Sequence, residues 1–118
     1  MSEPLVVQLA KRQLEAYNAA DLEAFCACYH AEVRVLDADG NVTVQGRVDF
    51  RARYADLFQN FEDVYATIDA RVVLHPHVVE RECWSRRSRA SGERSGGTVL
   101  VRYTERDGAI GTAQFLHG

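Results

Sequence analysis

Two groups of acidic residues have the type and spacing that proton-transfer chemistry requires. Asp37 ends an alternating segment in which Val33 and Val35 share its face, so its carboxyl would point toward the protein interior. Burial disfavours a charged carboxylate and raises its pKa toward the range of a general base, which can remove a proton next to a carbonyl. Alternatively, Asp37 opens the turn 37–40, where aspartate commonly makes local hydrogen bonds. The sequence leaves both interpretations open.

The second acidic group is Glu80 and Glu82, which share one face of a strand-like segment with Trp84, the only tryptophan in the chain. A tryptophan beside a carboxyl in a cavity forms an apolar wall against which the acid stays protonated. Glu82 is therefore a second candidate catalytic residue and Trp84 a candidate binding residue. The alternative is a solvated strand face, with three arginines as ion-pair partners: Arg71, Arg81 and Arg86.

Other reactive residue types give weaker patterns. His75 and His77 flank Pro76, which favours a surface turn over a metal site because no third ligand accompanies them. The basic stretch from Arg81 to Arg94 either holds an anionic ligand at a pocket mouth or forms a solvated hairpin. There is no glycine-rich phosphate loop, metal constellation or nucleophile motif, so we expect neither a metal nor a cofactor.

Composition excludes several classes of protein. The chain has 118 residues, of which 47% are hydrophobic and 26% charged, with a formal net charge of −3. These values are typical of one globular domain and argue against disorder, nucleic-acid binding and a membrane span. The three cysteines are too few for a disulfide framework, and Cys26 and Cys28 read as small core residues. With no signal-peptide pattern at the first residues, we expect a cytoplasmic protein.

The elements that must position these residues follow from periodicity. Helical spacing predicts three helices, of which the first is capped by Ser2 and the second by Asp21: 3–18, 22–29 and 47–61. Alternation and turn signals predict six strands: 33–37, 42–45, 64–74, 78–87, 98–105 and 109–116. The stretch 91–97 is rich in serine and glycine and is predicted to be a loop. Helices near the start and strands at the end predict one α+β domain over 1–118.

Local sequence at four places resembles a known superfamily. The segments are Tyr-Asn-Ala-Ala-Asp-Leu-Glu-Ala-Phe at 17–25, Ala-Glu-Val-Arg-Val at 31–35, Gly-Arg at 46–47 and Tyr-Thr-Glu-Arg-Asp-Gly-Ala-Ile at 103–110. With the element order, they resemble the nuclear-transport-factor-2-like superfamily, in its SnoaL-like and steroid delta-isomerase-like branch. The resemblance implies a cone-shaped, cystatin-like fold, with a curved antiparallel sheet of mixed edge around the helices and a central apolar pocket. It also implies a homodimer formed through the outer face of the sheet, where we expect Leu100 and Ile110.

The resemblance also implies positions for a site. In the steroid isomerase pattern Asp37 would be the base. The oxyanion-binding tyrosine of that pattern would fall at Gln13, and its acid at Val101, or at Arg102 if the hairpin is aligned with a different gap. Neither residue type matches the pattern. Substitute donors and pocket residues are then expected at further positions: Gln13, Tyr17, Tyr54, Trp84, Val101 and Tyr103. Tyr54 also fits simple core packing, since it is spaced with Phe50 and Phe58.

Three functions compete. The first is an isomerase-like enzyme that moves a proton next to a carbonyl, with Asp37 as base. The second is a non-catalytic protein that binds an apolar small molecule, either a ketone or an anionic metabolite. The third is an interaction domain that uses the outer sheet face. The fold alone does not choose among them, because one fold hosts many functions.

Overall fold

The computed structural model describes residues 3–118, and it forms three helices and one six-stranded sheet. The helices are α1 (Leu5–Asn18), α2 (Leu22–Ala27) and α3 (Arg47–Asn60). The strands are β1 (Tyr29–Leu36), β2 (Val42–Gln45), β3 (Phe61–Leu74), β4 (His77–Ser88), β5 (Arg94–Arg106) and β6 (Ala109–His117). Ser2, expected to cap the first helix, lies outside the described residues. Within 3–118, the helices are all too short or too polar to cross a bilayer.

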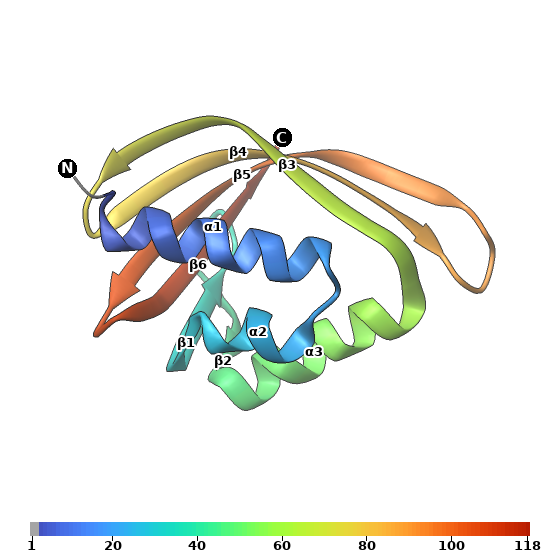
Figure 1. Cartoon of the computed structure of the whole chain (residues 1–118), viewed down its shortest axis with the longest axis horizontal. Helices are drawn as coiled ribbons and strands as arrows, with labels where there is room; N and C mark the ends of the chain where they lie inside the picture. The colour runs from blue at the N-terminus through green and yellow to red at the C-terminus, as the bar shows by residue number, and fades with distance from the viewer. Residues whose placement is uncertain (1–2) are drawn as a thin grey trace.

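The sheet has the order β2-β1-β6-β5-β4-β3 and is mixed, because β1 and β6 run parallel while the other pairs are antiparallel. It curves over the three helices, which all lie against one face (Figure 1). The predicted α+β class and element order are confirmed. Because successive strand residues alternate between faces, every second side chain points at the helices and the others point outward.

The helix boundaries follow from local chemistry. The Asp21 side chain accepts a hydrogen bond from the Ala24 backbone N–H at 3.1 Å, which confirms the predicted cap of α2. This helix ends at Ala27, earlier than predicted, and Tyr29 begins β1. There the Tyr29 ring packs on Phe50 of α3, with ring centroids 4.2 Å apart. The early end of α2 thus places the Tyr29 side chain inside the core.

The β4–β5 hairpin is longer than predicted, because residues 94–97 are strand rather than loop. Gly96 and Gly97 pair with Ser85 and Trp84 across the hairpin. A side chain at Gly96 would come within 2.7 Å of the Trp84 carbonyl oxygen, and one at Gly97 would touch the indole ring at 3.4 Å. The glycines therefore permit close approach to Trp84 instead of ending the strand, which is a known use of glycine inside sheets.

The alternation predicted for β3 is wrong in its second half. The pairing with β4 shifts between Ile68 and Ala70, which leaves Asp69 as an extra residue. Such a bulge exchanges the two faces of everything beyond it. Val72, expected on the inner face, is 71% exposed, whereas Arg71 turns inward opposite Glu80.

The outer face also differs from expectation. Leu100 is 42% exposed there, as predicted, but Ile110 is completely buried. Ile110 lies opposite Tyr29 in the β1–β6 pairing, and its side chain belongs to the core between sheet and helices. The exposed apolar side chains on the outer face include Tyr65, Val72 and Leu74 besides Leu100.

Candidate functional site

A cavity of about 730 Å³ lies between helices α1 and α3 and the inner face of the sheet. This volume is in the range of small-molecule sites. Its wall is mostly apolar and aromatic, with contributions from Leu14, Phe25, Leu57, Phe61, Val99 and Phe115. The cavity also explains why Tyr54 and Leu57 are only half-buried on the apolar face of α3: they border a hollow, not close-packed atoms.

Glu82 points into this cavity from the middle of β4. Burial, with a smaller contribution from the nearby Glu80 carboxylate, raises the pKa of its carboxyl to about 7. Glu82 makes no hydrogen bond or ion pair with any other residue between 3 and 118. Its carboxyl is therefore both accessible from the cavity and available to a ligand.

Three tyrosines surround Glu82 in the cavity wall: Tyr17, Tyr54 and Tyr103. Burial raises the pKa of Tyr17 to about 12, and it raises the pKa values of Tyr54 and Tyr103 as well. In each case the charge of Glu82 contributes to the rise, because an anion disfavours a second anion beside it. The three phenols stay neutral at physiological pH and can act as hydrogen-bond donors.

Gln13 lies on α1 and borders the same cavity, although it is only 4% exposed. Its side-chain oxygen accepts a hydrogen bond from the Tyr29 hydroxyl at 2.9 Å, and its amide donates to the Ala10 carbonyl at 3.1 Å. The second amide hydrogen has no partner among the described residues. Gln13 is thus held in place by two bonds and keeps one donor for a ligand.

Behind Glu82, the Glu80 carboxylate is 1% exposed and paired with Arg71. The Arg71 guanidinium donates a hydrogen bond from Nε to Oε2 at 2.7 Å, and its Nη2 atom lies 2.6 Å from the same oxygen in an ion pair. The other oxygen, Oε1, has no hydrogen-bond partner. The bulge at Asp69 makes this pair possible, because without it Arg71 would point outward.

Asp37 lies at the edge of the cavity, but its environment is the opposite of the one expected for a buried base. Its carboxylate accepts hydrogen bonds from the backbone N–H groups of Asn41 at 2.9 Å and Asp39 at 3.0 Å. The bond from Asn41 is the main reason that the pKa of Asp37 is lowered. The expectation of a raised pKa is therefore wrong, and the alternative, an aspartate that organises its own turn, describes the geometry.

The remaining sequence candidates divide between the cavity and the core. Trp84 borders the cavity beside Glu82, as the shared strand face predicted. Val101 is fully buried in the core and is not among the cavity-lining residues, so its expected place in the pocket wall is wrong. Val99, one step along the same face, lies at the cavity instead. Cys26 and Cys28 are buried core residues, as predicted.

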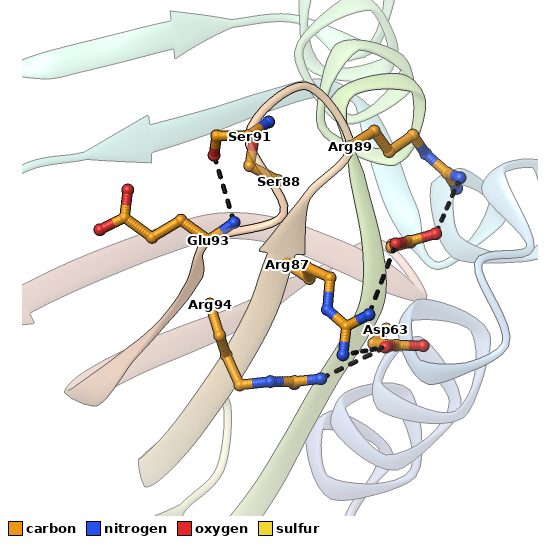
Figure 2. Close-up of polar contacts among 8 residues, drawn as sticks. Asp63, Arg87, Ser88, Arg89, Ser91, Glu93 and Arg94 are labelled. Carbon is orange, nitrogen blue, oxygen red and sulfur yellow. Dashed lines mark hydrogen bonds and ion pairs between the residues drawn. The ribbon is translucent and has the colours of Figure 1, made fainter.

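Most of the basic stretch is a solvated, ion-paired hairpin. Arg87 and Arg94 approach the Asp63 carboxylate at 3.9 and 3.3 Å, and Arg89 approaches Glu62 at 3.4 Å. Figure 2 shows Arg87 and Arg94 converging on Asp63.

Arg86 differs from these neighbours because it lines the cavity. The sequence predicted for Arg86 either an ion pair on the strand face or a place in the basic stretch, and neither prediction set it apart from its neighbours. Alternation places residues 84 and 86 on the same face, and this was the signal that separates Arg86 from the rest.

The architecture is that of the cystatin-like and ketosteroid-isomerase-like folds. An uncharacterised cystatin-fold protein from Novosphingobium aromaticivorans superposes with a TM-score of 0.86 at 19% identity, over 98% of this chain and 100% of that one. The Δ5-3-ketosteroid isomerase from a Mycobacterium species gives 0.85 at 15% identity, over 98% and 95%. A ketosteroid-isomerase-like protein from Catenulispora acidiphila, solved in complex with trimethylamine, gives 0.79 at 16%, over 94% and 85%.

Residues 10–111 match the SnoaL-like domain, and the chain belongs to that family. Among curated proteins, no sequence gives a significant match. The predicted family and fold are therefore confirmed. The structural neighbours differ in what they do, and at these identities they establish the fold alone.

Proposed function

We propose that this protein is a small-molecule enzyme that moves a proton on the carbon next to a carbonyl, with Glu82 as the base. The observation that carries the proposal is a carboxyl whose pKa is raised to about 7, facing an apolar cavity and free of protein partners. A base with a pKa near the working pH combines a populated carboxylate with sufficient proton affinity. Asp37, whose pKa is lowered by its turn, is the less suitable base.

In this mechanism the Glu82 carboxylate removes a proton from the carbon next to the carbonyl, and the electron pair of the broken C–H bond moves to the carbonyl oxygen as an enolate. The hydroxyl of Tyr54 and the spare amide hydrogen of Gln13 are the available donors for that oxygen, whereas the Tyr103 hydroxyl is engaged with Tyr29. The protonated Glu82 then returns the proton to a second carbon, which completes an isomerisation. Donors already fixed in place stabilise the enolate without reorganising, which is a large source of rate enhancement.

The test is the ultraviolet absorbance change on conjugation of an unconjugated 3-ketosteroid, measured for wild type, Glu82→Gln and Asp37→Asn. We expect Glu82→Gln to reduce turnover by about 10²-fold or more, as for loss of a general base, and Asp37→Asn to change it by only a few-fold. Wild-type turnover should rise with pH up to about 7, where Glu82 ionises. Loss of turnover in Asp37→Asn alone would return the base to Asp37. If wild type is inactive, deuterium exchange into smaller cyclic ketones extends the test to other substrates.

The cavity also supports a second candidate, a binding protein without catalysis. Its volume suits a ligand of several rings, and one structural neighbour was solved with a small molecule bound. A ligand at 100 times its Kd would stabilise the fold by about 2.7 kcal/mol. If ketones stabilise the protein in this way but it catalyses neither proton exchange nor isomerisation of them, the result would favour this function.

We also propose a homodimer through the outer face of the sheet. The support is the group of exposed apolar side chains on that face, Tyr65, Val72 and Leu100, which are 54%, 71% and 42% exposed. They lie on β3 and β5 with β4 between them, so they border one surface. Apolar side chains gathered on one exposed face commonly mark an association site.

A further inference from the structure

Arg86 is placed differently from the other arginines of the β4–β5 hairpin. Its guanidinium carbon lies 4.2 Å from the centre of the Phe61 ring and 5.0 Å from that of Trp84. All three residues line the cavity. The guanidinium thus lies against two aromatic walls of the pocket, an arrangement that fixes a cation and leaves its edge free for hydrogen bonds.

No protein carboxylate balances this charge. Arg81, Arg87, Arg89 and Arg94 all pair with acids on β3, whereas Arg86 makes no ion pair or hydrogen bond within residues 3–118. Its Nε atom is buried and lacks a partner. The two terminal nitrogens of Arg86 are not buried in this way and have no partner in the described part of the chain either, so an anionic ligand group in the cavity could pair with them.

We propose that Arg86 is the anion-recognition residue of the cavity, and that the ligand is a flat, apolar compound carrying one anionic group such as a carboxylate. This inference rests on the proposed use of the cavity as a ligand site. Glu82 and Arg86 share a strand face four residues apart, which is about 13 Å along a strand. Tyr17 lies within the influence of both charges. The ligand therefore extends past Tyr17, with its reacting carbon near Glu82 and its anionic end at Arg86.

The acids at the cavity reinforce this orientation. Asp37, Asp39, Asp56 and Glu82 all border the cavity and repel an anionic group. The other guanidinium at the cavity belongs to Arg53, which is exposed on α3. Of these two arginines, Arg86 is the one that packs on aromatic rings and has a buried nitrogen without a partner. Arg53 therefore serves as the control arginine at the cavity.

The test uses two fluorescent probes with the same rings: 8-anilinonaphthalene-1-sulfonate, which is anionic, and N-phenyl-1-naphthylamine, which lacks the sulfonate. Energy transfer from Trp84, the only tryptophan, reports binding of either probe, and the arginine variants locate it. We expect Arg86→Met to raise the Kd of the sulfonate about 10-fold or more, since a hydrogen bond to a charged group is lost, and to change the Kd of the neutral probe less than 2-fold. Arg87→Met, on the opposite face, should change neither.

Several outcomes would overturn the inference. Equal weakening of both probes by Arg86→Met would mean that Arg86 contributes only packing, and loss of anion binding in Arg53→Met instead would transfer the role. Failure of the sulfonate probe to bind wild type would contradict a ligand cavity of this kind. Circular dichroism checks the fold, with Arg86→Gln as a second variant; if both variants unfold, Arg86 is structural and the proposal fails.

These outcomes are separable from those of the proposed reaction. Probe binding is measured without turnover, so selective binding of the sulfonate in a protein that exchanges no proton refutes the reaction alone. Conversely, turnover lost in Glu82→Gln together with an unchanged probe ratio in Arg86→Met refutes only the role of Arg86.

Discussion

Replacing Glu82 with glutamine should stabilise the protein at alkaline pH and leave its stability nearly unchanged in acid. The folded-state pKa of Glu82 is raised from 4.5 to about 7. Below pH 4.5 the carboxyl is protonated in both states and burial carries no charge penalty. Between pH 4.5 and about 7 the unfolded chain releases this proton more readily, so the free energy of unfolding falls as pH rises. Glutamine has the same shape and no charge, so the variant lacks this loss.

The size of the effect follows from the same pKa shift. One pKa unit corresponds to about 1.4 kcal/mol, so a rise from 4.5 to about 7 sets an upper value of about 3 kcal/mol above pH 8. Access of water to the cavity reduces this, and we expect a gain of about 2 kcal/mol. A gain of this size is large beside the ordinary effect of a substitution, which is about 1 kcal/mol of destabilisation.

The assay is urea denaturation followed by Trp84 fluorescence and circular dichroism, at pH 4.5, 6, 7 and 8.5. The difference in unfolding free energy between Glu82→Gln and wild type should grow across this series and level off above about pH 8. Glu93→Gln, at an exposed site on the β4–β5 loop, is the matched control and should show no such growth. A difference that stays constant with pH would refute the assignment of a raised pKa to Glu82, and with it the main support for Glu82 as the base.

Three further perturbations test other parts of the structure. Arg71→Met leaves the buried Glu80 carboxylate unpaired and should destabilise the fold by about 3 kcal/mol in urea denaturation. The double variant Arg71→Met/Glu80→Gln should recover much of this loss, whereas equal stability of wild type and Arg71→Met would contradict a stabilising ion pair. Gly96→Ala forces a methyl group within 2.7 Å of the Trp84 carbonyl oxygen, so it should lower the free energy of unfolding by about 1–3 kcal/mol and shift the Trp84 fluorescence emission. Gly92→Ser in the loop should not change that emission. Leu100→Glu on the outer face should give a folded monomer in sedimentation equilibrium, with native circular dichroism and a Tm that no longer depends on protein concentration. A wild type that is itself monomeric would remove the proposed dimer.

Periodicity was sufficient for the element order, but the details that shape the site depend on contacts between distant residues. The cap at Asp21 is local and was predictable, as was the shared face of Glu82 and Trp84. The bulge at Asp69 is not visible in sequence, because alternation continues through it. The sequence predicts a loop at Gly96 and Gly97. The reason for glycine at these positions is contact with Trp84 on the opposing strand, which the local sequence does not reveal. For Asp37 the sequence allowed both a buried base and a turn aspartate, and the backbone hydrogen bonds from Asp39 and Asn41 decide for the turn.

The bulge at Asp69 has a consequence for how this fold can vary. It divides β3 into two segments whose inward side chains are set independently: the first holds Val64 and Ala66 near the helices, and the second holds Arg71 against Glu80. These faces depend on Asp69 staying out of the ladder: if it paired like its neighbours, Val72 would turn inward and Arg71 would turn away from Glu80. Deleting Asp69 would preserve both faces, because Ile68, Ala70 and Arg71 would then alternate regularly along β4. A one-codon deletion there would thus keep the charged interior layer, whereas a one-codon insertion just after Asp69 would act like several simultaneous substitutions and convert that layer into an apolar one.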